Sequence, residues 1–497
     1  MSAQEWLAIG PLLAVFALAM LAVVLDIARP GRDRLVTGVM VVGLLGAIAL
    51  TGYTAWYFGG GEVEVFGGAY VRDALTSFLD LLFLSIALLT ILFSPDYLHP
   101  RRLPMAEYAS TLMFAISGAM LLGAARDLLV LFLALELLVL PGYMLAGYAK
   151  RDGLSTEGAI KYFLLGSFSS AIFLFGLALV WGFAGSTRIP EVAAVLTSLD
   201  GAVSLTPALT MGLALLTAGV AFKIAAVPFH YWTPDAYQGS PTPVTGYLSV
   251  GPKVAAFALI LRLFVDALAP LKADWVPFIV VLAALTMTLG NLVALTQDNI
   301  KRMLAYSSIA HTGYILVGLA AYAAAPPGSD TERAGLEALL FYSAAYSFMN
   351  LGAFAVVTAL QKRTGVTSQI TTFAGLGRRA PLLGALMFLF LLSLTGIPPL
   401  AGFWAKAYVI IAAVQVDSPW LIGLAILTVL NAAAAAFYYL RIAVVMYMGE
   451  PSEQTAPVQV GRLVSAGLVL SAVATILIGL VPGPVIAFAQ EAARALL

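Results

Sequence analysis

The sequence contains no cysteine and only three histidines in 497 residues. The absence of cysteine excludes disulfides and thiolate-ligated zinc or iron–sulfur sites. The three histidines, His99, His230 and His311, lie far apart in the sequence, which argues against a bis-histidine haem. We therefore expect no cofactor or metal on this chain, and any redox chemistry connected with it is expected to reside on other polypeptides.

Charged residues are scarce as well. They make up 10% of the chain, against 61% hydrophobic residues, whereas a soluble protein carries about 25% charged residues. Apolar runs long enough to cross a bilayer, about 20 residues each, recur along the whole chain. The alternation of polar and apolar residues that marks barrel strands is absent from the sequence. The sequence therefore predicts an all-α polytopic membrane protein.

Hydropathy predicts fourteen membrane spans, the twelfth of them with an internal break. The N-terminal residues MSAQEW include no basic residue, so the first apolar segment is predicted to be a retained helix rather than a signal peptide. The predicted spans lie near residues 5–27, 35–58, 74–94, 106–124, 127–149, 157–184, 205–230, 243–268, 275–296, 299–323, 336–361, 381–411, 419–447 and 463–490.

Lysine and arginine are distributed unequally between the predicted loops. The odd-numbered loops carry fourteen of these residues and the even-numbered loops carry five. Because basic loops remain on the cytoplasmic side of a membrane, we expect both termini to lie on the outer side. No phosphate-binding or dinucleotide fingerprint occurs in the sequence, and we expect the lipid bilayer, not nucleic acid, to surround this chain.

An internal repeat relates the two halves of the chain. Residues 126–148 echo residues 297–319 at an offset of 171, with Asp127 matching Asp298, and the offset becomes 180 in the next span. The copies lie five spans apart, an odd number, so they are predicted to cross the membrane in opposite directions, as in many transporters. The alternative is chance similarity between two apolar stretches.

Spans 4–8 and 9–13 are thus predicted to form two inverted five-helix repeats. On this basis we divide the chain into an N-terminal three-helix segment (1–104), a first repeat (105–270), a second repeat (271–448) and a C-terminal helix (449–497).

Two spans are predicted to be discontinuous. Span 7 runs into FKIAAVPFHYWTPDAYQGSPTP (222–243), which contains four prolines. Span 12 contains SLTGIPPLAGFWAKAYVI (393–410), in which two adjacent prolines lie between glycines. Proline lacks a backbone donor and clashes with the preceding helical turn. A continuous helix is therefore not expected at either place.

Four ionisable residues lie deep in apolar sequence, namely Glu136, Lys223, Lys253 and Lys406. An unpaired charge at the bilayer centre costs at least about 2.5–3.5 kcal/mol, so such residues face the bundle interior or water and usually have a function. Burial and a nearby carboxylate shift the pKa of a lysine in opposite directions, which allows proton exchange near neutral pH. The four residues are candidates for a proton relay, and a structural ion pair between Glu136 and Lys223 is the alternative.

Three further residues are candidates with open alternatives. Lys161 follows Glu157 at the i+4 spacing of an ordinary helix ion pair, so it is either a relay residue or a surface pair. His230 follows the break in span 7 and is either a relay residue or a loop histidine at the membrane surface. His311, in the middle of span 10, lies in a water-lined polar patch or packs as a core histidine. Asp80, in the middle of span 3, has no evident partner.

Two long motifs resemble the antiporter-like membrane subunits of respiratory complex I. They are FKIAAVPFHYWTPDAYQGSPTPVTGYLSVGPKVAAF (222–257) and TQDNIKRMLAYSSIAHTGY (296–314). The segment PDAYQGSPTPVTGYLSVGPK is more similar to N-type subunits than to L or M types. The long lateral helix of the L type is not found in this sequence. Lys406 also fits the N type, since the M type has a glutamate there. The resemblance covers nearly the whole chain.

The resemblance implies a proton-translocating membrane-arm subunit of NADH-quinone oxidoreductase in the bacterial inner membrane, coupled to distant electron transfer from NADH to quinone. By position it implies that Glu136 and Lys223 are partners, that Lys253 is the central relay lysine and that Lys406 is the distal one. It also matches Lys161 to a relay lysine inside the membrane. The implied neighbours are the M and K subunits, with FMN, iron–sulfur clusters and quinone on other subunits.

Two alternative functions remain at this point. One is a subunit of an Mrp-type multisubunit cation/proton antiporter, which shares the fold. The other is an inert scaffold, which would tolerate methionine at each buried lysine. The desolvation cost of four buried ionisable groups argues against the scaffold.

Overall fold

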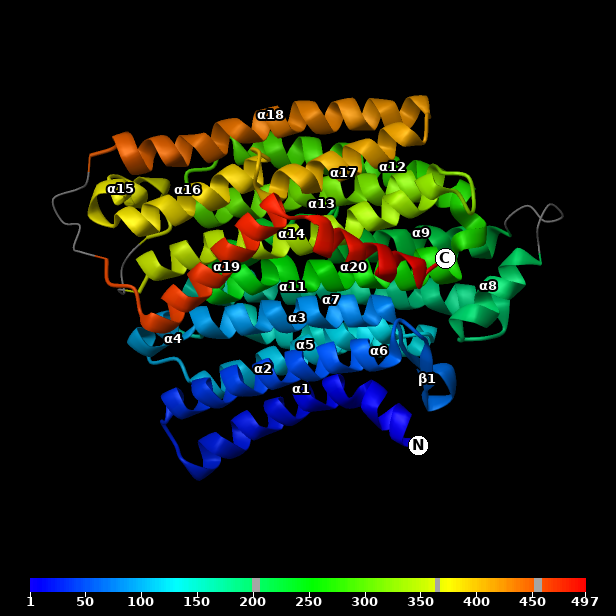
Figure 1. Cartoon of the computed structure of the whole chain (residues 1–497), viewed down its shortest axis with the longest axis horizontal. Coiled ribbons are helices and arrows are strands. Elements are labelled where there is room, and N and C mark those ends of the chain that lie inside the picture. Colours follow the sequence, from blue (N-terminus) through cyan, green and yellow to red (C-terminus); the bar gives the residue numbers. More distant parts are fainter. Residues whose placement is uncertain (199–205, 363–366, 451–457) are drawn as a thin grey trace.

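The computed structural model describes residues 1–198, 206–362, 367–450 and 458–497. Figure 1 shows a bundle of long helices lying side by side, which confirms the predicted all-α polytopic architecture. Within the described residues, 12 helices are long and apolar enough to cross a membrane. The shorter helix α9 and the pair α16–α17 supply two more spans, so the predicted fourteen are present.

The spans are formed by α1 (Ala3–Ala28), α2 (Asp33–Phe58), α3 (Ala74–Phe93), α5 (Met105–Ala124), α6 (Leu128–Ala146), α7 (Gly153–Ala184), α9 (Pro207–Lys223), α11 (Thr242–Ile260), α12 (Lys272–Ala294), α13 (Ile300–Ala324), α14 (Asp330–Leu360), α16 (Pro381–Thr395) with α17 (Ala401–Gln415), α18 (Pro419–Met448) and α19 (Arg462–Leu480). The connections contain α4 (Pro95–Leu98), α8 (Ile189–Thr197), α10 (Trp232–Gly239), α15 (Leu376–Arg379), the strands β1 (Val63–Val65) and β2 (Tyr70–Arg72), 3₁₀ turns at Phe66–Gly68, His99–Arg101, Ala269–Leu271 and Ile370–Phe373, and a π-helical turn at Leu261–Ala267. The last helix, α20 (Gly483–Arg494), follows α19.

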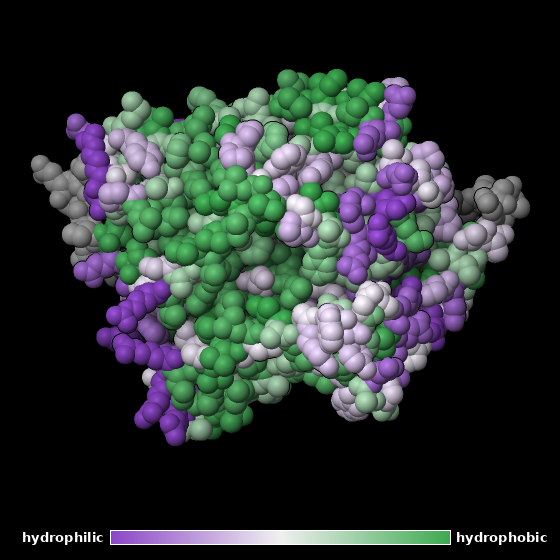
Figure 2. Space-filling view, viewed as in Figure 1, coloured by the Kyte–Doolittle hydropathy of each residue, from purple (hydrophilic) through white to green (hydrophobic). Residues whose placement is uncertain are grey.

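The surface has the layering expected of a membrane protein. Figure 2 shows a broad hydrophobic band between two hydrophilic ends of the bundle. Both termini lie at the same end, together with β1 and α8, while α4 and α15 lie at the opposite end (Figure 1). An even number of spans requires this arrangement of the termini.

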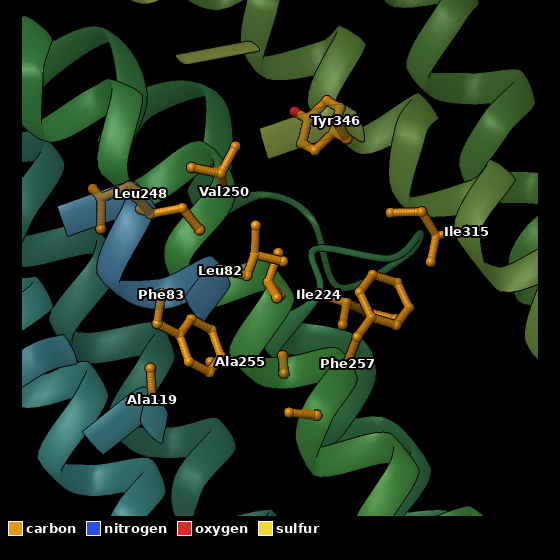
Figure 3. Close-up of a cluster of buried hydrophobic side chains, with 14 of the residues drawn as sticks. Leu82, Phe83, Ala119, Ile224, Leu248, Val250, Ala255, Phe257, Ile315 and Tyr346 are labelled. Carbon is orange, nitrogen blue, oxygen red and sulfur yellow. The ribbon is translucent and has the colours of Figure 1, made fainter. Parts of the chain in front are cut away.

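The helices at the centre of the bundle are α11, α13 and α14. Their most apolar windows are 94–100% buried, whereas those of α2, α12 and α18 are 33% buried. Figure 3 shows apolar side chains on two sides of α11: Phe83 of α3 lies near Ala255, and Phe257 lies beside Ile224 and Ile315. These side chains are buried in the core and pack hydrocarbon against both sides of α11. Polar groups on the central helices are therefore shielded from lipid.

The starts of α6 and α13 share one local structure, which supports the internal repeat. In each helix a side-chain cap, Asp127 or Asn299, accepts hydrogen bonds from the second and third helical N–H groups. In each, the first helical N–H bonds at 2.8 Å to a carbonyl beyond the following helix, Thr187 or Ser368. These two contacts lie at opposite ends of the bundle, near β1 and near α15 respectively (Figure 1), so the copies are inverted. The predicted match of Asp127 with Asp298 is wrong by one residue here.

Several predicted boundaries and connections are wrong. Span 7 was predicted to continue to residue 230, but α9 ends at Lys223. The single span predicted at 463–490 is two helices, because Pro482 and Pro484 interrupt the chain between α19 and α20. The β1–β2 hairpin and α8 lie in connections for which the sequence predicted no regular structure.

The partner of Asp80 is Arg72, whose side chain enters the bundle from β2. The two side chains form an ion pair and are each 1% exposed. Arg72 Nη2 also donates to Thr54 Oγ1 of α2 at 2.9 Å. The sequence placed Arg72 in a loop, so its burial was missed.

A second buried cation, Arg262, lies in the π-helical turn that ends α11. Its guanidinium pairs with Asp73 Oδ2 at 2.6 Å and with Asp266 Oδ2 at 3.2 Å. Its Nε also donates to the carbonyl of Gly123 in α5 at 2.8 Å. This group ties spans 3, 4 and 8 together at one end of the bundle.

Candidate functional site

The break in span 7 is buried and keeps its backbone groups bonded. The helix α9 ends at Lys223, and Pro228 supplies no N–H for its continuation. The Ile224 carbonyl accepts from Thr312 Oγ1 at 3.0 Å. The N–H of Val227 donates to Thr286 Oγ1 at 3.0 Å. Side chains of α12 and α13 thus replace the missing helical bonds, which lets an interrupted backbone persist inside the bundle.

Lys223 lies at the end of α9 and is 6% exposed. Its amine donates to Ser170 Oγ of α7 at 2.8 Å and makes no ion pair with Glu136. Glu136 is half-buried on α6, and its Oε1 is buried without a hydrogen-bond partner. The alternative of a direct structural pair between these two residues is therefore not realised.

A cavity of about 10 Å³ lies beside Lys223, lined also by Tyr162 and Trp232. A cavity needs roughly 10–15 Å³ to hold one water molecule. The space next to this amine therefore admits about one water.

Lys253 lies in α11 and is 3% exposed. Its amine donates to the Ser308 carbonyl at 2.7 Å and to Thr312 Oγ1 at 3.1 Å, both on α13. Thr312 is the residue that also donates to the Ile224 carbonyl in the break of span 7. One hydroxyl therefore connects the central lysine to the interrupted helix.

Pro252, next to Lys253, frees one carbonyl in a helix that stays continuous. Because proline has no N–H, the carbonyl of Leu248, four residues earlier, lacks its usual helical donor. It accepts instead from the Tyr237 hydroxyl at 2.9 Å. A side chain of α10 thus takes the place of the missing backbone donor.

His311 lies on α13 and is 1% exposed. Its Nδ1 is 2.8 Å from the Tyr342 hydroxyl of α14, and its Nε2 is 3.3 Å from the Tyr439 hydroxyl of α18. Tyr439 also shares a hydrogen bond with Ser307. A neutral imidazole donates from one nitrogen and accepts at the other, so both tyrosines can be satisfied in either tautomer. The ring joins three helices through hydroxyl groups.

The break in span 12 binds Lys406 through carbonyl groups. The helix α16 ends at Thr395, where Gly396 adopts φ +96°, a conformation that favours glycine. The Lys406 amine donates to the Leu394 carbonyl at 3.0 Å and to the Thr395 carbonyl at 2.7 Å. The last carbonyls of a helix lack internal partners and carry its partial negative charge. The amine, 5.1 Å from the centre of the Tyr314 ring, therefore occupies a site built for a cation.

Comparison with known proteins decides the family. Residues 125–431 match the family described as NADH:quinone oxidoreductase/Mrp antiporter, TM. The chain is 41% identical over 97% of its length to NADH-quinone oxidoreductase subunit N of Trichlorobacter lovleyi, of which the match covers 95%. The chain belongs to the subunit N family of NADH-quinone oxidoreductase.

Solved structures agree with membership of the subunit N family. A chain of respiratory complex I from Thermus thermophilus with bound aureothin superposes with a TM-score of 0.78 and 33% identity, covering 96% of this chain and 98% of that chain. A chain of the Mrp complex from a Dietzia species gives a TM-score of 0.83 at 23% identity, covering 100% and 98%. At that identity the Mrp likeness shows the fold alone, so the Mrp alternative is the weaker one.

Lys161, which the subunit N resemblance matched to a relay lysine, has a half-exposed side chain. Its amine is 2.6 Å from Glu157, which confirms the predicted i+4 pair, and 2.7 Å from Asp235 Oδ2 of α10. The other oxygen of Asp235 pairs with Arg302 of α13 at 2.7 Å. The sequence missed Asp235, although it lies in the proline-rich stretch after span 7. The structure groups Lys161 with this ionic bridge and not with the three buried lysines.

His230 is buried at the break, so it is not a histidine of an exposed loop. Its ring stacks against Tyr231 at 4.8 Å between centroids, and its Nδ1 is buried without a hydrogen-bond partner. It makes no hydrogen bond to Lys223 or Lys253. The relay role predicted for His230 has no direct contact to support it.

Replacing Gly402 by alanine is expected to destabilise the break in span 12 by about 1–3 kcal/mol, because the new methyl group overpacks the site. A Cβ at Gly402 would lie 1.8 Å from the Ser393 carbonyl oxygen. The matched control is Gly423→Ala in α18, where a Cβ meets nothing within 4 Å. Thermal unfolding of the purified complex measures the stability of both variants. An unfolding temperature for Gly402→Ala equal to that of the wild type would contradict this description of the break.

Proposed function

We propose that the chain moves protons across the membrane as a non-redox subunit of NADH-quinone oxidoreductase, driven by electron transfer on other subunits. The observation that carries the proposal is the set of three buried lysines, Lys223, Lys253 and Lys406. Lys223 and Lys406 lie at the breaks in spans 7 and 12, and Lys253 follows a proline inside α11. Every hydrogen bond that their amines make goes to a neutral oxygen. Membership of the subunit N family supports the same assignment.

Neutral oxygen partners suit a group that gains and loses a proton. A buried lysine held by a carboxylate stays charged, because the ion pair stabilises the charged form. Carbonyl and hydroxyl groups solvate an ammonium group but do not hold it in the charged state as a carboxylate does. Nearby charges then decide whether the lysine is protonated. Ionisable groups within membrane spans are costly, so their retention here favours function over packing.

The helix α13 gives the proposed relay its direction. Ser308 and Thr312 contact Lys253. Tyr314, three residues after His311, contacts Lys406, so His311 lies between Ser308 and Tyr314 along the helix. We propose that protons pass from the break in span 7 to Lys253, around α13 past His311, and leave near Lys406.

Glu136 is proposed to control Lys223 through space. Two unit charges 4 Å apart interact by about 4 kcal/mol at an effective dielectric constant of 20, and by half that at twice the distance. Since 1.4 kcal/mol corresponds to a factor of ten in an equilibrium constant, an interaction of about 2–4 kcal/mol changes a protonation equilibrium more than tenfold. No direct contact is needed.

Glu136→Gln and Lys223→Ala are each expected to leave assembly intact and to lower coupled quinone-reductase activity and proton pumping several-fold. The matched control is Glu107→Gln, since Glu107 is an exposed carboxylate in the first turn of α5. Proton pumping is measured with the complex in liposomes by quenching of a pH-sensitive dye. Pumping at the wild-type rate in either variant would remove that residue from the relay.

We propose that the neighbours of this chain are the M and K subunits of the complex, with FMN, iron–sulfur clusters and quinone bound by other subunits. The basic loops lie at the end of the bundle that holds α4 and α15 (Figure 1), so we place that end in the cytoplasm and both termini outside. Copurification tests these partners: recovery of short antiporter subunits in place of complex I subunits would favour the Mrp alternative.

A further inference from the structure

A cavity of about 850 Å³ opens where α1 turns into α2, beside the segment between α4 and α5. Three arginines line it, Arg32, Arg34 and Arg102, and within the described part of the chain none of them forms an ion pair. By contrast, the neighbouring Arg101 is occupied, since its Nη2 donates to the Gln361 carbonyl at 2.8 Å. The proposed relay makes no use of this cavity.

The acidic and titratable groups of the cavity leave it positive. Asp33 and His99 pair with each other at 3.2 Å. Asp26 is the other carboxylate in the lining. The three arginines therefore outnumber the two carboxylates of the lining, Asp26 and Asp33. The helices α2 and α5 both begin at the cavity, α2 at Asp33 and α5 directly after Pro104. The N-termini of helices attract anions.

The surroundings of the cavity are those of a lipid headgroup site. The last turns of α1 expose Val23, Val24 and Ile27, the last with 76% exposure. Figure 2 shows hydrophilic residues at the edge of the bundle where Figure 1 places the α1–α2 turn, bordered by hydrophobic surface. A phospholipid at this height would put its phosphate level with the arginines and its acyl chains along α1.

We propose that this cavity binds the headgroup of an anionic phospholipid, with its phosphate held by Arg32, Arg34 and Arg102. Guanidinium groups bind phosphate oxygens through paired, charge-assisted hydrogen bonds. Basic pockets between spans are a known form of anionic headgroup recognition. The site lies at the N-terminal three-helix segment, so it would anchor that segment to the lipid.

The test is the binding of short-chain phosphatidylglycerol to the purified intact complex, followed by native mass spectrometry that releases this subunit with its adducts. In Arg32→Gln/Arg34→Gln/Arg102→Gln, we expect the dissociation constant to rise at least about tenfold, because the charge-assisted hydrogen bonds to the phosphate are lost. The triple lysine variant at the same positions should retain most of the binding, because the charge is kept.

The matched control is Lys150→Gln/Arg151→Gln/Arg378→Gln, which removes three positive charges from the same end of the bundle but none from this cavity. It should bind phosphatidylglycerol like the wild type. Unchanged binding in the arginine-to-glutamine variant would overturn the site. Equal binding of phosphatidylethanolamine or phosphatidylcholine would overturn its anionic preference, and equal binding of inorganic phosphate would overturn the assignment to a lipid.

Discussion

Replacing Lys253 with methionine is expected to lower proton pumping by the assembled complex at least about tenfold, since a positioned proton-transfer group contributes roughly 10²–10⁴-fold. Methionine fills the space of the lysine stem. The two groups that lose the amine remain paired: the Thr312 hydroxyl still donates to the Ile224 carbonyl at 3.0 Å, and the Ser308 carbonyl lies inside α13, where it accepts the N–H four residues on. The fold should therefore tolerate the change. Pumping is measured in liposomes, with NADH oxidation by an artificial acceptor as the check on assembly.

The Lys253→Arg variant separates a relay from a structural charge. Arginine keeps the positive charge but holds its proton, because the pKa of its guanidinium lies far above neutral pH. A relay predicts that Lys253→Arg pumps as poorly as Lys253→Met. Wild-type pumping by Lys253→Arg would show that only the charge at this position matters, and pumping by both variants would restore the scaffold alternative.

Replacing Arg262 with methionine is expected to destabilise the protein by about 3–5 kcal/mol, the cost of leaving buried charges without their partner. Asp73 and Asp266, 5% and 11% exposed, would both lose their cation. The subunit should then be depleted from the assembled complex, as measured by native gel electrophoresis and by thermal unfolding of what remains.

The variant Arg262→Met/Asp73→Asn/Asp266→Asn provides the control, because it removes the cation and both charges together. It should recover much of the lost stability, since an asparagine at position 73 can still cap α3, where Asp73 now accepts from the Thr76 N–H at 2.7 Å. If Arg262→Met were as stable as the wild type, the π-helical turn would have no part in holding spans 3, 4 and 8 together.

The span number and the two interrupted helices were predictable from the sequence, because both depend on local properties. Hydrocarbon thickness sets the length of an apolar helix, and proline removes a backbone donor wherever it occurs. The burial of Lys223, Lys253 and Lys406 followed from the same hydropathy. The structure confirms that all three are buried.

The contacts between buried groups were not predictable, because they depend on how distant helices pack. Arg72 was assigned to a loop, although the β1–β2 hairpin inserts it opposite Asp80. Asp235 lies in the proline-rich stretch after span 7, yet it forms ion pairs with Lys161 of α7 and Arg302 of α13. Pro252 shows that the Leu248 carbonyl needs another donor, but only the packing shows that this donor is Tyr237. The sequence shows which groups need partners, and tertiary packing decides which partners they find.

The central claim is that a proton can travel between Lys253 and Lys406 along α13. The most direct measurement is a density map of the complex at a resolution that shows ordered water. The account predicts water molecules that, together with His311 and its tyrosine partners, link the Lys253 amine to the Lys406 amine at hydrogen-bonding distances. A continuous apolar gap between these two amines, without water in any state of the enzyme, would contradict it.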